Sequence, residues 1–505
     1  MTEVVASAPG KVLLTGGYLV LEKPNSGIVL STNARFYAIV KPIYDEIQSE
    51  SWSWAWTDVR LTSPQLSRES MYKLSLKNCS LQCLSPSESR NPYVEQAVQY
   101  TVAAARVKFH NEKRDALTKL LLQGLDITIL GDNGFYSYRD QLESRGLPIK
   151  PESLATLPRF TSIKFNSNEG AEKSCKPEVA KTGLGSSAAM TTAVVAALLQ
   201  YLGAVHLSPF PGSNESDGLD LIHIIAQTAH CIAQGKIGSG FDISSAVYGS
   251  HRYVRFSPSV IASAQKVGKG MTLEEAALDI MNEHWDNERT RFSLPPLMTL
   301  LLGEPGSGGS STPSMVGAVK KWQSQEPEKY YQIWKGLSDA NADLESRFRA
   351  LGVLAESELE AYQSVIQACC RTAPPKWCEH AADEKRDAVV EALIGARNAM
   401  LRIRSCMRRM GEAAGVPIEP ESQTKLLDLT METEGVLVAG IPGAGGFDAV
   451  FAVALADSGA GLAAKWCSLN VLPLLVREDP RGVSLETCDP RGEDITSAVS
   501  AVQIS

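Results

Sequence analysis

The sequence lacks three features that each define a class of protein. No apolar run reaches the roughly 20 residues that a membrane-spanning helix needs, so we expect no membrane partner. Basic residues are not in excess, because 49 lysines and arginines stand against 57 aspartates and glutamates, for a net charge of −8. A nucleic-acid-binding protein needs a basic surface, so we expect no nucleic-acid partner either. The chain has ten cysteines, but they do not show the spacing of a zinc site.

Targeting signals are also missing from the sequence. Pro9-Gly10 interrupts any apolar stretch near the N-terminus, so we predict no secretory signal peptide. The residues Gln503-Ile504-Ser505 match neither a peroxisomal nor an endoplasmic-reticulum signal. We therefore expect reduced cysteines and a cytoplasmic protein.

A stretch rich in glycine and serine precedes the most apolar segment of the chain. It reads Lys181-Thr182-Gly183-Leu184-Gly185-Ser186-Ser187-Ala188-Ala189, and residues 190–199 after it predict a buried helix. Glycines let a ligand approach the backbone, and a helix start offers unpaired N–H groups and partial positive charge. The two serine hydroxyls can contact phosphate oxygens or Mg²⁺. The stretch predicts a phosphate-binding loop, although a flexible connector before a core helix explains it equally well.

Three further glycine-rich turns carry residues suited to phosphate chemistry. Lys11 follows a Pro-Gly turn, Asp242 follows Gly238-Ser239-Gly240, and Gly443-Ala444-Gly445-Gly446 lies between two predicted strands. An ordinary surface lysine and a helix-capping aspartate are the simpler alternatives. Together with the first stretch, however, these turns indicate one cleft that holds several phosphate groups, with backbone N–H groups and a cation offsetting their charge.

A chain of 505 residues is too long for one core, so we expect at least two domains. We predict an N-terminal domain at 1–292 and a C-terminal domain at 293–505, separated near Leu294-Pro295-Pro296. Residues 131–178 are polar and predict a partly ordered excursion from the first domain.

Two groups of ionisable residues fit ordinary structural roles. His223 and His230 have helical spacing without a third ligand nearby, and we interpret them as packing or surface residues. Five arginines lie between Arg397 and Arg409, and we interpret them as a solvated helix face from which one or two could contact an anionic substrate.

Four segments of the chain resemble the motifs of the GHMP kinases, which include galactokinase, homoserine kinase, mevalonate kinase and phosphomevalonate kinase. These segments read SAPGKVLLTGGYLVLE, KTGLGSSAA, GKIGSGFDIS and PGAGGFDAV. Their wording is most similar to the phosphomevalonate kinases of fungi and plants. The resemblance implies a two-domain α+β fold, with one domain like ribosomal protein S5 domain 2 and one ferredoxin-like domain. It also implies ATP-dependent phosphorylation of 5-phosphomevalonate to 5-diphosphomevalonate in isoprenoid and sterol precursor synthesis.

The same resemblance implies roles for individual residues. ATP would lie on the loop 181–189, with Ser187 as a Mg²⁺ ligand. Lys11 would stand between the transferred phosphoryl group and its acceptor, and Asp242 matches the catalytic aspartate. Mevalonate kinases carry a glutamate as second Mg²⁺ ligand where this chain has Cys231, so that ligand is unassigned. The residues expected to contact the phosphorylated substrate are Lys11, Tyr18, Ser239, Ser311, Thr312, Gly443, Ala444, Gly445 and Gly446.

Two other functions remain open from the sequence. One is a GHMP kinase that phosphorylates an alcohol such as mevalonate, and the other is a regulator that binds nucleotide without turnover. For the leading function we expect ATP and a small phosphorylated molecule as partners, and a monomer or homodimer.

Overall fold

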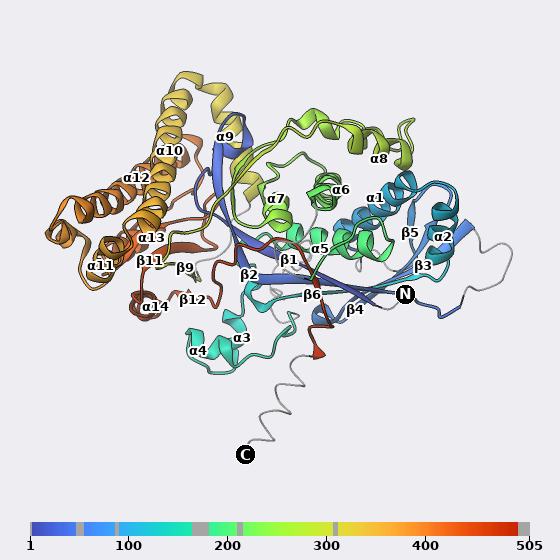
Figure 1. Ribbon diagram of the computed structural model, residues 1–505, viewed down its shortest axis with the longest axis horizontal. Helices are drawn as coiled ribbons and strands as arrows, with labels where there is room; N and C mark the ends of the chain where they lie inside the picture. The colour runs from blue at the N-terminus through green and yellow to red at the C-terminus, as the bar shows by residue number, and fades with distance from the viewer. Residues whose placement is uncertain are drawn as a thin grey trace, which may run out of the picture.

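The structure is a computed structural model that describes residues 3–46, 55–85, 90–163, 181–209, 216–306 and 312–492. Within these residues the strands form two sheets, one of nine strands and one of four (Figure 1). Helices cover one face of the larger sheet, and a second set of helices packs with the smaller sheet. The architecture is therefore of the predicted α+β class.

The larger sheet runs in the order β13-β1-β2-β6-β3-β4-β5, and β7 and β8 extend it from β2. Its strands pair antiparallel except for β3 and β6, which are parallel. The strand bounds are β1 (Val4–Leu13), β2 (Ser26–Lys41), β3 (Trp56–Ser63), β4 (Arg68–Ser75), β5 (Leu81–Cys83), β6 (Leu125–Gly131), β7 (His251–Val254), β8 (Glu288–Arg291) and β13 (Ser484–Glu486).

The pairing of β1 with β2 changes register between Pro9 and Lys11. Such irregularities re-aim side chains and are frequent beside functional sites. A Cβ on Gly10 would lie 2.9 Å from the ring of Phe135 and 3.1 Å from the carbonyl oxygen of Leu184, so only glycine fits there. The chain can therefore bring Lys11 directly against the loop that precedes α5 (Ser186–Tyr201).

Helix α5 (Ser186–Tyr201) is the centre of the helical layer. It packs on β1, β2, α1, α6 and α7, and its residues 188–199 are all buried. This confirms the prediction of a buried helix after the glycine-serine stretch. The other helices of this part are α1 (Pro92–Lys108), α2 (Glu112–Leu121), α3 (Arg139–Ser144), α4 (Pro151–Ala155), α6 (Ser216–Gln234), α7 (Phe241–Tyr248) and α8 (Leu273–Asn282), with short 3-10 turns that include η1 (Leu19–Leu21) and η5 (Asn133–Phe135).

The smaller sheet is antiparallel and runs in the order β10-β11-β9-β12. The long helices α10 and α12 pack along one another and, with α11, extend away from it at the left of Figure 1. The bounds are β9 (Met298–Glu304), β10 (Val436–Gly440), β11 (Val450–Leu455), β12 (Leu472–Pro473), α9 (Thr312–Gln325), α10 (Pro327–Ser357), α11 (Leu359–Cys369), α12 (Glu384–Ala414), α13 (Glu421–Met431) and α14 (Gly459–Ser468).

The last described segment of the chain returns to the larger sheet. Strand β13 pairs with β1, the Ser31 hydroxyl donates to the carbonyl of Asp479 over 2.6 Å, and Arg35 donates to the carbonyl of Gly482 over 2.7 Å. The predicted boundary at 292/293 precedes β9, and the polar excursion contains η5, α3 and α4, while its residues 164–178 lie outside the described residues. No helix in the described ranges combines the length and the apolar character needed to span a bilayer.

Candidate active site

Lys11 forms hydrogen bonds to the glycine-serine loop through both its backbone and its side chain. Its N–H donates to the carbonyl of Leu184 over 2.9 Å, and its Nζ donates to the carbonyl of Gly183 over 2.9 Å. Gly183 and Gly185 have φ values of +77° and +74°, a region that favours glycine. A Cβ on Gly185 would lie 3.0 Å from Cε of Lys11, so the absence of a side chain there makes room for the lysine.

The loop ends where α5 begins, and Gly185 is the N-cap residue of this helix. Because glycine has no side chain, none caps the backbone N–H groups in the first turn of α5. Backbone groups of residues 134–136 anchor the loop. The N–H of Thr182 donates to the carbonyl of Phe135 over 3.2 Å, and its hydroxyl donates to the carbonyl of Gly134 over 2.6 Å. Lys181 pairs with Tyr136 in an isolated antiparallel β-bridge. This anchoring fixes a helix N-terminus, whose partial positive charge attracts anions.

The Ser187 hydroxyl belongs to a small polar network inside the helical layer. It lies 3.1 Å from Nε2 of His230, and Nε2 of Gln234 lies 3.2 Å from the same nitrogen. The ring of Tyr93 packs on that of His230 with centroids 5.3 Å apart. Burial lowers the pKa of His230, although the charge of Asp242 opposes this shift, so the imidazole is neutral at physiological pH. Our interpretation of His230 as a packing or surface residue is therefore incomplete, because its ring also lies within hydrogen-bond distance of Ser187 and Gln234. The i, i+4 spacing of His230 and Gln234 could have indicated the contact between these two side chains.

Asp242 lies in the first turn of α7, and its Oδ1 accepts the N–H of Ile243 over 3.0 Å. The turn before it requires glycine, because a Cβ on Gly240 (φ +85°) would come within 2.6 Å of the ring of Phe256. Lys11 lies close to the start of α7, because its Nζ is 5.5 Å from the centroid of the Phe241 ring, the residue before Asp242. Burial lowers the pKa of Lys11, and the negative charge of Asp242 acts in the opposite direction.

The turn that carries Ser239 is connected to η1, which follows the glycine turn Gly16–Gly17. The carbonyl of Ser239 accepts the hydroxyl of Tyr253 over 2.9 Å. Arg255 donates to the carbonyls of Leu21 over 2.5 Å and of Gly238 over 2.8 Å, so one guanidinium joins η1 to the turn before α7. Burial lowers the pKa of Arg255, but an arginine remains charged at physiological pH.

The glycine turn Gly16–Gly17, which follows β1, meets the turn Gly443–Gly446 across the two sheets. The Tyr18 hydroxyl donates to the carbonyl of Ala444 over 2.9 Å, and Tyr18 is buried with a strained φ of +62°. A Cβ on Gly17 would lie 2.5 Å from the carbonyl oxygen of Gly443. Of the predicted substrate contacts, Ser311 and the side chain of Thr312 lie outside the described residues.

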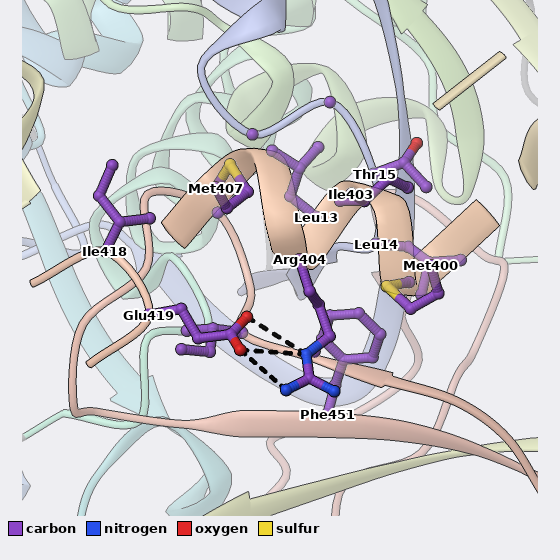
Figure 2. Close-up of a pocket in the computed structure, with 15 residues that line it drawn as sticks. Leu13, Leu14, Thr15, Met400, Ile403, Arg404, Met407, Ile418, Glu419 and Phe451 are labelled. Atoms are coloured by element: carbon purple, nitrogen blue, oxygen red, sulfur yellow. Dashed lines mark hydrogen bonds and ion pairs between the residues drawn. The ribbon is translucent and has the colours of Figure 1, made fainter. Parts of the chain in front are cut away.

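A small cavity of about 30 Å³ lies where the turn Gly16–Gly17 meets α12 and the end of β10 (Figure 2). Arg404 lines it with only 2% of its surface exposed, so the interpretation of the arginine run as a solvated face is wrong at this position. Glu419 and Asp428, both distant in sequence, provide the carboxylates that allow the guanidinium to be buried.

Two known families match the sequence. The GHMP kinases N terminal domain matches residues 161–250, and the GHMP kinases C terminal family matches residues 389–471. The chain is 64% identical over 503 residues to a phosphomevalonate kinase of Arabidopsis thaliana, with 99% of each chain covered. It is 31% identical over 476 residues to a phosphomevalonate kinase of Aspergillus fumigatus, covering 88% of this chain and 85% of that protein.

The fold also matches a solved structure, Streptococcus pneumoniae phosphomevalonate kinase in complex with phosphomevalonate and AMPPNP. The TM-score is 0.55 at 14% sequence identity, and the match covers 95% of this chain and 100% of the other. At this identity the likeness concerns the fold alone, and it confirms the predicted two-domain GHMP kinase fold.

The comparison with the plant relative corrects the predicted location. The Arabidopsis protein is named as peroxisomal, which contradicts our expectation of a cytoplasmic protein. That expectation depended only on missing signals, and a tripeptide that departs from the common peroxisomal pattern is weak grounds for placing a protein in the cytoplasm.

Proposed function

The chain belongs to the phosphomevalonate kinases of the GHMP kinase family, and we propose that it transfers the γ-phosphoryl group of ATP to 5-phosphomevalonate, yielding ADP and 5-diphosphomevalonate. The observation that carries this proposal is the position of Lys11, which contacts the glycine-serine loop and whose Nζ lies over the ring of Phe241, the residue before Asp242. A phosphoryl transfer between two anions needs a cation at this place.

ATP fits the loop from Lys181 to Ala189. The space in front of Gly183 is open, because a Cβ there would meet nothing within 4 Å. The uncapped amides at the start of α5 can donate to phosphate oxygens, and the helix dipole favours their negative charge. These features support a nucleotide site whose phosphates lie against the backbone.

Lys11 can offset the repulsion between donor and acceptor phosphates. An ammonium group has three N–H donors, and the carbonyl of Gly183 takes one of them. The other two can reach phosphate oxygens. Burial favours the neutral amine, but anions bound nearby would favour the charged form, as Asp242 already does.

Asp242 has a different role for a phosphate acceptor than for an alcohol acceptor. An alcohol must lose a proton to a base as it attacks. A phosphomonoester has a second pKa of about 6 and is mostly a dianion at neutral pH. For 5-phosphomevalonate a base is therefore largely unnecessary, and Asp242 would orient Lys11 instead.

Mg²⁺ would bind together with ATP, and few of its ligands would come from the protein. Across the described ranges no three His, Cys, Asp or Glu side chains are grouped as a metal site, and Cys231 is buried against the amide of Gln227. Mg²⁺ prefers oxygen ligands and is often shared between substrate phosphates, water and one or two protein groups. The Ser187 hydroxyl, held by His230, fits such a role.

This metal role can be tested without measuring turnover. Mn²⁺ binding to the protein with a non-hydrolysable ATP analogue, followed by electron paramagnetic resonance, should weaken in Ser187→Ala and in His230→Ala. Unchanged Mn²⁺ affinity in Ser187→Ala would refute the assignment of Ser187 as a metal ligand.

The proposed reaction is tested by incubating the protein with ATP-Mg²⁺ and, separately, phosphomevalonate, mevalonate or galactose, and following ADP release. We expect turnover with phosphomevalonate. Turnover with mevalonate instead would support the alcohol-kinase alternative, and nucleotide binding without turnover on any of the three would support the regulator.

We also propose a peroxisomal location, which the name of the Arabidopsis relative supports. Cell fractionation of the native protein, detected with an antibody alongside a peroxisomal marker, tests it. Recovery in the soluble fraction from cells with intact peroxisomes would contradict it.

A further inference from the structure

A buried ion cluster lies next to the last glycine turn. Arg404 of α12 donates to Glu419 through Nε over 3.1 Å and through Nη2 over 2.8 Å, as Figure 2 shows. Only 2% of Arg404 and 8% of Glu419 are exposed. Nη2 of Arg404 also donates to Asp428 over 2.8 Å, and Arg408 donates to Glu419 over 2.7 Å.

The cluster is not suited to bind an anionic ligand. Its two guanidinium groups are balanced by its two carboxylates, so no net positive charge remains. The adjoining cavity of about 30 Å³ has room for about one water molecule, and its other lining residues are mostly apolar. Nη1 of Arg404 is buried without a hydrogen-bond partner among the described residues, and one water in the cavity would satisfy it.

The backbone beside the cluster instead holds the turn Gly443–Gly446. Ile418 precedes Glu419 directly, and its carbonyl accepts the N–H of Gly446 over 2.9 Å. A Cβ on Gly445 would lie 2.2 Å from the same carbonyl oxygen, so the two backbones are in close contact. On its other side the turn is held by the hydroxyl of Tyr18.

We propose that Arg404 and Glu419 are a positioning pair for the turn Gly443–Gly446. The guanidinium fixes the Glu419 carboxylate by two hydrogen bonds, which fixes the carbonyl of Ile418 and with it the amide of Gly446. The turn then holds the geometry needed to close over the phosphorylated acceptor. This inference rests on the proposed function, in which the turn contacts that acceptor.

Arg404 and Glu419 line the same cavity as Gly443 and have no hydrogen bond to the nucleotide loop among the described residues. Breaking their ion pair should therefore affect the use of phosphomevalonate more than the use of ATP. Glu419→Gln keeps the shape of the side chain and one acceptor oxygen but removes the charge. We expect the KM for phosphomevalonate to rise about tenfold, as loss of one charge-assisted hydrogen bond produces. The KM for ATP should change by less than about twofold, within ordinary variation between sites that do not contact each other.

Arg397→Met is the matched control for a general loss of stability. Arg397 lies on the same helix and donates to the carbonyls of Met431 over 2.8 Å and of Val436 over 2.7 Å, at the end of β10 away from the turn. At a comparable fall in Tm, this variant should leave the KM for phosphomevalonate unchanged. An equal rise in both variants, or no rise in folded Glu419→Gln, would overturn the inference.

Hydrogen exchange gives a readout that does not depend on turnover. The amide of Gly446 should exchange about tenfold faster in Glu419→Gln than in the wild type or Arg397→Met, because its acceptor is no longer held. If the wild type fails to phosphorylate phosphomevalonate, the proposed function fails while this exchange test still decides the positioning role. Equal exchange in all three proteins would refute that role.

Discussion

Replacing Lys11 by Met removes the ammonium while keeping much of the volume of the stem. The structure leaves two N–H donors of Nζ for phosphate oxygens once the carbonyl of Gly183 has taken the third. A hydrogen bond to a charged group contributes about 1.5–3 kcal/mol, so two of them correspond to about 10²–10⁴ in rate if they form in the transition state. We therefore expect kcat to fall about 10³-fold. Asp242→Asn keeps the acceptor oxygen for Ile243 and should lower kcat only about tenfold, since it removes one neighbouring charge.

Coupled ADP release with phosphomevalonate measures both variants. Lys329→Met is the matched control, because the side chain of Lys329 is 74% exposed and contacts Glu326, the N-cap residue of α10. It should keep wild-type kcat. A loss in Asp242→Asn that exceeds the loss in Lys11→Met would refute the reasoning, because proton abstraction by a general base contributes about 10²–10⁴ and belongs to an alcohol acceptor.

Three further predictions concern the glycine turns and the folded state. Gly185→Ala places a Cβ 3.0 Å from Cε of Lys11 at a φ of +74°, a strain of about 1–2 kcal/mol, and should lower kcat/KM at least about tenfold in the ADP assay; full activity would show that the lysine is not confined there. Tyr18→Phe leaves the carbonyl of Ala444 unpaired and should lower the free energy of unfolding by about 1–3 kcal/mol in urea titrations, whereas an unchanged value would mean that water replaces the hydroxyl. Burial lowers the pKa of His251 from 6.5 to about 4. Between these two pH values this imidazole is protonated in the unfolded chain and neutral in the folded protein. The free energy of unfolding should therefore fall as pH drops from 6.5 towards 4, by up to about 1.4 kcal/mol per pH unit from this residue, and His251→Asn should show a shallower slope; equal slopes would refute the assignment.

The elements with strong local patterns could be predicted from the sequence. The apolar run after Ser187 predicts a buried helix, and α5 is buried along residues 188–199. The glycine turns could be located because positive φ and close backbone approach demand glycine, as at Gly185 and Gly445. Which turns lie together was only a hypothesis, because contacts such as Tyr18 with Ala444 join residues more than 400 positions apart.

The buried arginine shows why other features were missed. Arg404 lies four residues after Met400 and three before Met407, on the apolar stripe of α12, whereas Arg402 and Arg409 are exposed. Helical periodicity could therefore have marked it as inward-facing. Its partner Glu419 could not be identified, because an ion pair between separate segments depends on the tertiary fold. The same holds for β13, a strand of three residues in a polar segment.

In the proposed reaction the phosphoryl group passes from ATP to a phosphate oxygen of the acceptor. Phosphorus NMR of the protein with ATP-Mg²⁺ and phosphomevalonate observes this bond directly. We predict that the monoester signal is replaced by the two coupled signals of a diphosphate as ADP accumulates. ADP with inorganic phosphate and an unchanged monoester, or a second monoester signal from a phosphorylated hydroxyl, would contradict transfer to the acceptor phosphate.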